Sequence, residues 1–153
     1  MNQLEKLAAE QRFTTDIRKR IFMIIMSADD YLDATQKLLK LKITKKQAQE
    51  IAVVLVESCA QEATFNKYYA YLADNLIRVN RNLKYSFQYS LWDHMKLLEN
   101  YTLRKIANIA KFMSFLVTRN TLGLQVLRSL DFDSLNQHQE IFLKIFFQEF
   151  YAK

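Results

Sequence analysis

Apolar residues recur along this chain at alternating steps of three and four positions, the spacing that lines one face of an α-helix. The clearest series consists of Leu103, Ile106, Ala110, Met113 and Val117. An earlier series repeats the spacing with Leu83, Phe87, Leu91, His94 and Leu98. Both series predict amphipathic helices that bury one side and expose the other.

Polar residues that can cap a helix stand before most of the apolar runs. The predicted caps are Thr15, Ser27 with Asp30, Thr44 with Gln47, Asn66 and Asn136, and the two pairs resemble capping boxes. Runs and caps together predict about eight helices. We place them near residues 16–26, 29–41, 45–60, 66–80, 83–98, 103–118, 122–130 and 136–151.

The scarcity of turn-forming residues favours an all-α fold. The chain has no proline and a single glycine, Gly123, so it lacks the residues that build β-hairpin turns. Residues 52–56 are rich enough in valine for a buried strand, but the surrounding stretch 47–62 has helix length and no turn signal. Because short connections make successive helices antiparallel, we expect helical hairpins that stack as in helical solenoids.

The composition fits one folded domain with a continuous core. Half of the 153 residues are hydrophobic, yet no run of about 18 apolar residues is present to span a membrane. Residues 1–13 are polar and mixed in charge, unlike a secretion signal, which predicts a cytosolic or nuclear protein. The single cysteine, Cys59, lies in an apolar run and is expected to be a buried, unreactive thiol.

Little in the sequence indicates catalysis. His94 and His138 lie far apart and in no zinc-binding spacing, and one glycine cannot build a loop that cradles phosphates. The many carboxylates are interpreted as solvated helix faces. We therefore predict a domain with no catalytic residue, cofactor or metal, which acts by binding other molecules.

Three aspartates, Asp29, Asp30 and Asp33, gather at the turn into the second predicted helix of a chain with a formal charge of +6. An acid in the first turn of a helix complements the helix dipole, which explains Asp29 or Asp30. Asp33 lies one turn further in and shares a helix face with Asp29, so an arginine of a partner protein is a second explanation. We predict that the three aspartates bind a partner.

Basic residues concentrate at two turns. The first group is Lys37, Lys40, Lys42, Lys45 and Lys46, and the second is Arg78, Arg81 and Lys84. Cations near helix C-termini offset the dipole, which accounts for Lys37, Lys40 and Arg78 without a ligand. The alternative is that the lysine turn contacts RNA phosphates, or an acidic partner, in a salt-dependent way.

Four stretches of the chain resemble the MA3 domain family. Residues 15–22 (TDIRKRIF) and 30–41 (DYLDATQKLLKL) carry the general resemblance. Residues 59–72 (CAQEATFNKYYAYL) and 87–93 (FQYSLWD) are similar to its nucleolar branch, in which a middle domain like that of initiation factor 4G precedes the MA3 domain. We accordingly expect an N-terminal extension over residues 1–13 and an MA3-type helical domain over residues 14–153.

The resemblance implies a HEAT-like stack of hairpins that hydrolyses nothing itself and binds or regulates a DEAD-box RNA helicase of the initiation-factor-4A type. For the nucleolar branch it implies a nucleolar or nuclear factor that meets other ribosome assembly factors in early processing of ribosomal RNA and small-subunit assembly. A sister branch acts in pre-mRNA splicing, which is the alternative.

The resemblance also bears on individual residues. In members that clamp the helicase directly, acids at positions matching Asp29, Asp30 and Asp33 meet helicase arginines. Those members carry a further Asp-Val-Pro element before a late helix, where this chain has Leu-Arg-Lys-Ile at residues 103–106. Half of the acidic contact is therefore absent here, and a preceding middle domain would supply the main helicase contact.

Overall fold

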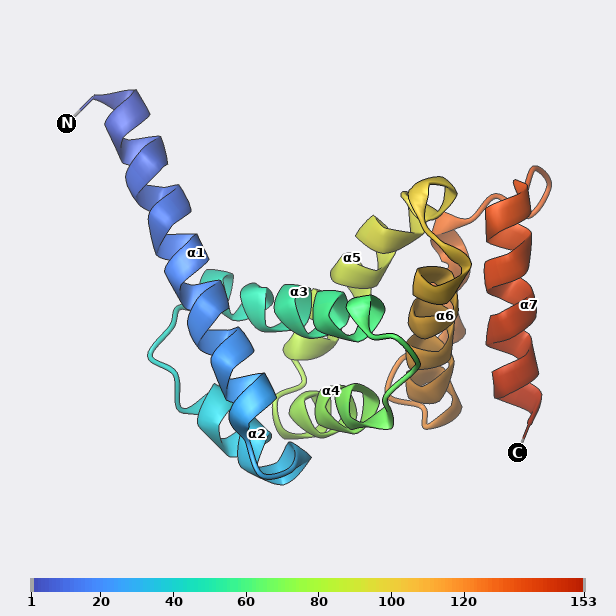
Figure 1. The fold of residues 1–153 in the computed structure, drawn as a ribbon, viewed down its shortest axis with the longest axis horizontal. Helices are drawn as coiled ribbons and strands as arrows, with labels where there is room; N and C mark the ends of the chain where they lie inside the picture. The colour runs from blue at the N-terminus through green and yellow to red at the C-terminus, as the bar shows by residue number, and fades with distance from the viewer. Residues whose placement is uncertain (1, 153) are drawn as a thin grey trace.

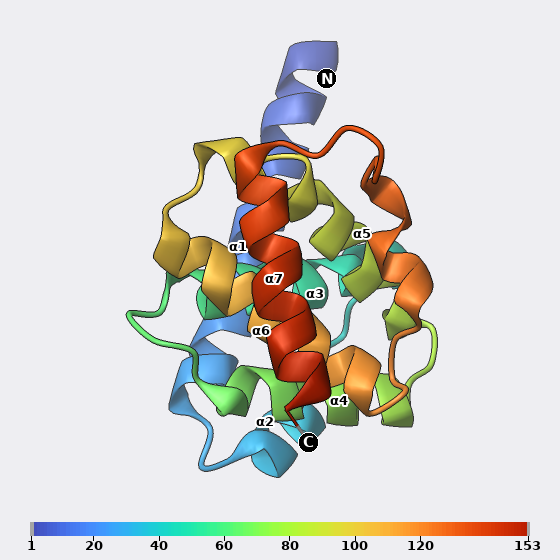
Figure 2. The same ribbon diagram turned by 90° about the vertical axis from the view of Figure 1, so that its right-hand side faces the viewer.

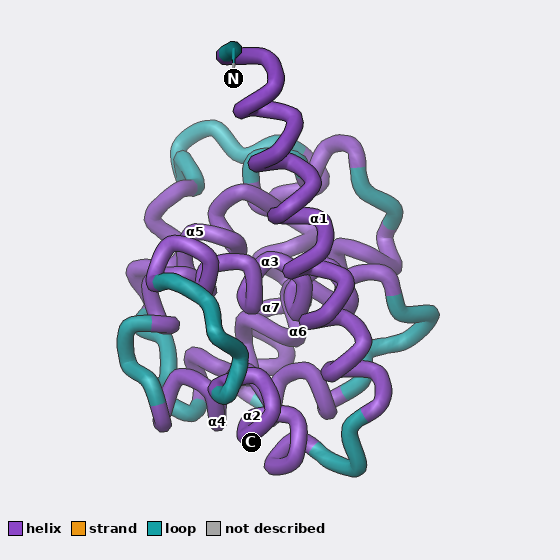
Figure 3. The backbone as a smooth tube through the Cα atoms, turned by 90° about the vertical axis from the view of Figure 1, so that its left-hand side faces the viewer, coloured by secondary structure: helices purple, strands orange, loops and turns teal. Residues whose placement is uncertain are grey.

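The computed structural model describes residues 2–152, and in this range the backbone forms helices and loops without a strand (Figures 1 and 3). The α-helices are α1 (Gln3–Ser27), α2 (Tyr31–Leu39), α3 (Lys45–Gln61), α4 (Lys67–Val79), α5 (Leu83–Met95), α6 (Leu103–Thr118) and α7 (Gln137–Tyr151). Two 3-10 helices, η1 (Leu98–Asn100) and η2 (Leu124–Ser129), lie in the later connections. The predicted all-α class is confirmed.

The helices stack as hairpins, with α3 at the centre (Figure 1). In the first two hairpins, α1 packs on α3 while α2 packs on α4. The stack continues because α3 also packs against α5 and α4 against α6. Helix α7 covers α6 at the edge of the molecule opposite α1 (Figures 1 and 2). The predicted stack of antiparallel hairpins is therefore confirmed.

One continuous apolar core joins the hairpins. The valine-rich run 52–56 is helical, as predicted, and most of it is buried in the middle of α3. Phe87 of α5 and Phe112 of α6 are fully buried and lie against each other, with ring centroids 6.4 Å apart. Phe146 of α7 is also fully buried, and its carbonyl accepts a hydrogen bond from the Ser114 hydroxyl at 3.0 Å. Each fully buried phenylalanine contributes about 1.5–3 kcal/mol.

Three predicted helix caps are confirmed. The Thr44 hydroxyl accepts from the Gln47 amide at 3.2 Å, and the Gln47 side chain accepts from the Thr44 amide at 2.9 Å, which completes a capping box. Asn136 caps α7 in the same reciprocal way. The Asn66 side chain accepts from the Tyr68 amide at 3.0 Å and begins α4. These local bonds satisfy amides that a helix start leaves without partners.

The start of α1 differs from the prediction. The helix expected near residue 16 begins at Gln3, where the Asn2 side chain caps it by accepting from the Glu5 amide at 2.8 Å. Thr15 is therefore inside the helix, and its hydroxyl donates to the Gln11 carbonyl at 2.9 Å. The first half of α1 extends away from the stack (Figures 1 and 3). Its apolar periodicity is weak, which agrees with the exposure of residues 3–12, of which only Ala9 is partly buried.

Other helix boundaries also differ from the prediction. Ser27 is the last residue of α1 and its hydroxyl bonds back to Met23, so the predicted box with Asp30 does not form. The helix expected at 83–98 ends at Met95, and the one expected at 122–130 is the 3-10 helix η2. Leu103, predicted to be buried, is exposed at the first position of α6.

Candidate partner-binding surfaces

The three predicted acids lie together in the turn between α1 and α2. Asp30 is the N-cap of α2, and its carboxylate accepts from the Asp33 amide at 2.8 Å. Asp33 in turn accepts from the Asp29 amide at 3.0 Å and from the Lys37 ammonium at 2.9 Å. Asp29 precedes the cap and is not in the first helical turn as predicted. The side chains of Asp29 and Asp30 are exposed to solvent.

The three acids are not equivalent. Asp33 is half-buried, and the amide of Asp29 together with the Lys37 ammonium lowers the pKa of its carboxyl below the ordinary value. The cation that Asp33 requires is therefore supplied by this chain, one helical turn away. Asp29 and Asp30 are left as the carboxylates best placed to meet a partner's cation.

The predicted lysines divide into two groups. All five are exposed, and Lys37, Lys40 and Lys42 line a shallow hollow of 580 Å³ together with Arg20 and Ile24 of α1 and Leu41. The two others, Lys45 and Lys46, begin α3, where their charges oppose the helix dipole. Arg20 was missed from the sequence because it precedes the lysines by more than fifteen positions and joins them only through the packing of α1 beside α2.

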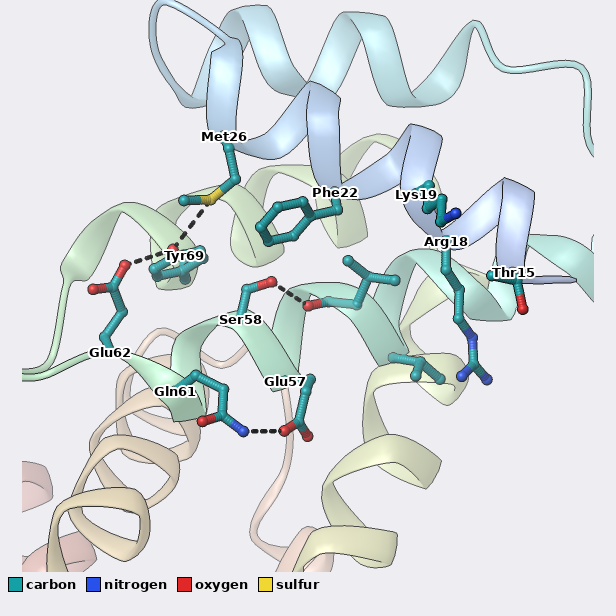
Figure 4. Close-up of a pocket in the computed structure, with 12 residues that line it drawn as sticks. Thr15, Arg18, Lys19, Phe22, Met26, Glu57, Ser58, Gln61, Glu62 and Tyr69 are labelled. Atoms are coloured by element: carbon teal, nitrogen blue, oxygen red, sulfur yellow. Dashed lines mark hydrogen bonds between the residues drawn. The ribbon is translucent and has the colours of Figure 1, made fainter.

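A larger groove runs between α1 and α3, and nothing in the sequence indicated it. Its volume is 740 Å³, and its apolar lining consists of Phe22 and Met26 of α1 (Figure 4) with Val53 and Val54 of α3. The Tyr69 side chain from α4 closes one end, where its hydroxyl donates to Glu62 at 2.7 Å. Burial and the neighbouring Glu62 carboxylate raise the pKa of Tyr69, so the phenol keeps its proton.

Charged residues of opposite sign stand at the two ends of this groove (Figure 4). Arg18 and Lys19 lie at the end nearer the start of α1, and Arg18 is paired with Glu50 at 2.6 Å. Glu62, which directly follows α3, lies at the other end beside Met26 and Tyr69, while Glu57 lies on α3 between the two ends (Figure 4). The groove is thus an apolar channel with a basic end and an acidic end.

Glu57 also belongs to a cluster that joins α3 to α5 and α6. His94 places Nε2 3.3 Å from Glu57, and its Nδ1 lies 2.7 Å from the Tyr101 hydroxyl. Burial lowers the pKa of His94 more than the Glu57 charge raises it, so the ring is neutral near pH 7. Such a ring donates from Nε2 to Glu57 and accepts from Tyr101. Lys105, 3.5 Å from Glu57, completes the cluster as a structural contact.

Asp74 is a buried acid that the sequence did not single out. Its carboxylate lies 3.1 Å from the Arg78 Nε and 3.1 Å from the Arg119 Nε, and it accepts a hydrogen bond from the Thr121 hydroxyl. The Arg119 guanidinium also lies over the Phe115 ring, 5.2 Å from its centroid. The predicted cation Arg78 is therefore occupied by a contact within the chain that holds α4 to the end of α6.

Neither a cluster of metal ligands nor a reactive thiol is found among residues 2–152. No three His, Cys, Asp or Glu side chains of this range lie close enough together to hold a metal ion. Cys59 is buried as predicted, and burial raises the pKa of its thiol to about 12, which disfavours the reactive thiolate. Within the same range, no helix combines the length and the apolar character that crossing a bilayer requires.

Comparison with protein families decides what kind of domain this is. The model of the MA3 domain matches residues 17–123, which is more than half of the chain. The chain belongs to the MA3 domain family. The match begins within α1 and ends just after α6, so it includes the acidic turn and both walls of the groove, while η2 and α7 follow it.

Individual relatives confirm the resemblance to the nucleolar branch. This MA3 domain is 37% identical over 143 residues to the human "Nucleolar MIF4G domain-containing protein 1", and the match covers 94% of the chain and 17% of that protein. "Suppressor of glycerol defect protein 1" of Schizosaccharomyces pombe is 31% identical over 156 residues, covering 97% of the chain and 20% of that protein. The chain thus spans a fifth or less of the length of these relatives. The name of the human relative confirms the expected nucleolar or nuclear location.

A splicing relative is also similar. "Pre-mRNA-splicing factor CWC22" of Pyricularia oryzae is 30% identical over 135 residues, covering 87% of this MA3 domain and 15% of that protein. MA3 domains are helical interaction modules, which agrees with a surface made of grooves and charged turns.

Proposed function

We propose that this MA3 domain binds a DEAD-box RNA helicase of the initiation-factor-4A type within a nucleolar factor that acts in early ribosomal RNA processing and small-subunit assembly. The domain itself catalyses no reaction and offers a docking surface. The proposal goes beyond the family membership, because the relatives' names identify neither the helicase nor the step in assembly.

The observation that carries the proposal is the acidic turn. Asp29 and Asp30 are exposed at the place where the MA3 resemblance puts acids that meet arginines, on a chain whose formal charge is +6. Two carboxylates held by a helix start form a preorganised partner for a guanidinium, because the turn is already fixed by the hydrogen bonds of Asp33.

We propose that the second half of the helicase contact is made outside this domain. At the start of α6, Thr102 caps the helix and Arg104 is exposed, so this region presents a cation where an acidic element would be needed. We infer that the acidic turn guides and orients the helicase, while a preceding domain of the full-length protein makes the larger contact. The affinity for the helicase should therefore depend only moderately on Asp29 and Asp30.

The test removes the charge without removing the cap. Asn caps a helix about as well as Asp, so Asp29→Asn with Asp30→Asn should leave α2 intact. Loss of two exposed charges that face arginines should weaken helicase binding by about 1–2 kcal/mol, or roughly 5- to 30-fold in Kd. Isothermal titration of the purified helicase into the protein containing this domain measures the change.

A matched control is available at the other end of the molecule. Asp131 and Asp133 are both exposed in the loop before α7, and Asp131→Asn with Asp133→Asn makes the same change in net charge. The control should leave the Kd within about twofold, because distant exposed charges are screened. Equal affinity of the wild type and the Asp29, Asp30 variant would refute the proposed surface, as would equal weakening by the control.

A second candidate function is RNA binding by the basic hollow. Arg20, Lys40 and Lys42 surround it without any ion pair to an acid among residues 2–152. Three cations around one hollow can hold backbone phosphates without reading sequence.

The alternative to ribosome assembly is pre-mRNA splicing. Crosslinking of the tagged protein in cell extract separates these two processes, because ribosomal precursors and spliceosomes contain different partners.

A further inference from the structure

The α1–α3 groove leaves large apolar side chains in contact with solvent. The exposed fraction is 44% for Phe22 and 52% for Met26, and both side chains line the groove. Met23, between them in sequence, is 62% exposed but does not line the groove. Apolar hollows rimmed by charged residues are typical of sites that bind another protein. The groove therefore has the character of a docking site that is distinct from the acidic turn.

The walls of the groove determine which backbone conformation a bound peptide can adopt. Both long walls, α1 and α3, are helices whose backbone amides and carbonyls bond within the helix. An extended peptide would find no strand edge to pair with along these walls, whereas a helix satisfies its own backbone groups. From Thr15 to Met26 the groove follows α1 for about 16 Å, or three helical turns at 1.5 Å per residue. A helix of that length presents apolar anchors at positions i, i+3 or i+4, and i+7.

The charges at the ends determine the polarity of the occupant. Lys19 has no ion pair with any residue in the range 2–152, and its neighbour Arg18 is already neutralised by Glu50. Between the ends Glu57 is compensated by Lys105, whereas the Glu62 carboxylate at the other end accepts from the Tyr69 hydroxyl and pairs with no cation of the described chain. One uncompensated charge of each sign therefore remains. Opposite charges on a ligand would fix its direction in the groove.

We propose that the α1–α3 groove binds an amphipathic helix of a partner protein, with three apolar anchors, an acidic residue at the end beside Lys19 and a basic residue at the end beside Glu62. The Phe22 side chain holds the central anchor against Val53 and Val54, and Met26 contacts the anchor nearest the Glu62 end. This surface is separate from the acidic turn, so its occupation does not depend on the helicase contact.

The experiment pans a displayed library of 16-residue helical peptides on the purified domain and measures the enriched peptides by fluorescence anisotropy. We expect the enriched sequences to share the three apolar anchors, with acids at one end and bases at the other. Phe22→Ala should weaken the best peptide by about 30-fold, as truncation of a central aromatic contact does. The matched control Met23→Ala should change the Kd by less than about twofold, because Met23 lies outside the groove.

Charge reversal tests the polarity separately from the apolar contact. Lys19→Glu should weaken the selected peptide and strengthen a version of it in which the acid at that end is replaced by lysine, a switch that general destabilisation would not produce. Thermal melts of each variant confirm that the fold is retained, and the Asp29, Asp30 variant should still bind the peptide.

Four outcomes would overturn the proposal. They are the enrichment of no peptide, equal binding to Phe22→Ala, no exchange of preference in Lys19→Glu, and self-association. In the last case, sedimentation would show a dimer that Phe22→Ala dissociates, and the groove would belong to a second copy of the chain.

Discussion

Replacement of Asp74 by asparagine removes the charge at the centre of the network that joins α4 to the end of α6. The carboxylate is 5% exposed, and it is shared by Arg78, Arg119 and Thr121. Arg119 and Thr121 lie more than forty residues later than Asp74, so the network closes a long loop of chain. Asparagine preserves the shape and one acceptor oxygen, and changes mainly the charge.

The expected loss of stability in Asp74→Asn depends on how well the two arginines are solvated without the carboxylate. Removing one partner of a fully buried ion pair costs about 3–5 kcal/mol, because the other charge is left without compensation. Here the side chains of Arg78 and Arg119 are 54% and 38% exposed, so both can be hydrated by water. Each lost ion pair should then cost about 1 kcal/mol, and the remaining oxygen can still accept from Thr121. We expect a decrease of about 2 kcal/mol in the free energy of unfolding, or roughly 4–8 °C in Tm.

Urea denaturation followed by circular dichroism measures this loss, provided that the slope of the transition is unchanged. Asp131→Asn, at an exposed loop position, is the matched control and should shift the free energy of unfolding by less than about 0.5 kcal/mol. The double variant Asp74→Asn with Arg119→Gln should cost less than the sum of the single changes, because the two residues share one contact. If Asp74→Asn costs no more than the control, the network does not stabilise the fold and the reasoning fails.

Two further results are expected. Replacement of Arg20, Lys40 and Lys42 by glutamine should reduce the steepness of log K against log salt for single-stranded RNA by about 2, at about 0.7 per lost phosphate contact. The control Lys144→Gln on α7 should leave it unchanged. Filter binding across a salt series measures the slope, and an unchanged slope in the triple variant would exclude the hollow as the RNA-binding site. Burial lowers the pKa of His94 in the folded protein below its unfolded value of 6.5. Between these two pKa values the unfolded chain binds more protons than the folded one, so the free energy of unfolding should fall as the pH decreases from 6.5 toward the folded pKa. His94→Gln should flatten that part of the pH profile in thermal melts, and an equally steep profile would contradict the assignment.

Local information was enough to identify most helices and their caps. The Thr44 box and the Asn66 and Asn136 caps were predicted correctly because each depends on bonds between residues two or three positions apart. The acidic turn was also predictable as a cluster, since its members lie within five consecutive positions. That such a turn meets a protein partner is an expectation from the family resemblance, and it stays a prediction.

The start of α1 was missed although a local signal existed. Residues 3–12 are almost all strong helix formers, and Asn2 stands before them as a cap. Apolar periodicity predicts burial, whereas residues 3–12 are all exposed except the partly buried Ala9. Helix propensity and burial are separate properties, and only the first was present there.

Contacts between distant segments could not be predicted. The partners of Asp74, the position of Arg20 beside the lysines, and the groove between α1 and α3 all depend on how whole helices pack. The sequence alone determined that the chain would form capped amphipathic helices and where its acids and lysines would cluster, because those features arise from neighbours along the chain. The tertiary structure alone decided which charges are compensated internally and which apolar side chains remain open to a partner, because both depend on surfaces that meet only after the hairpins stack.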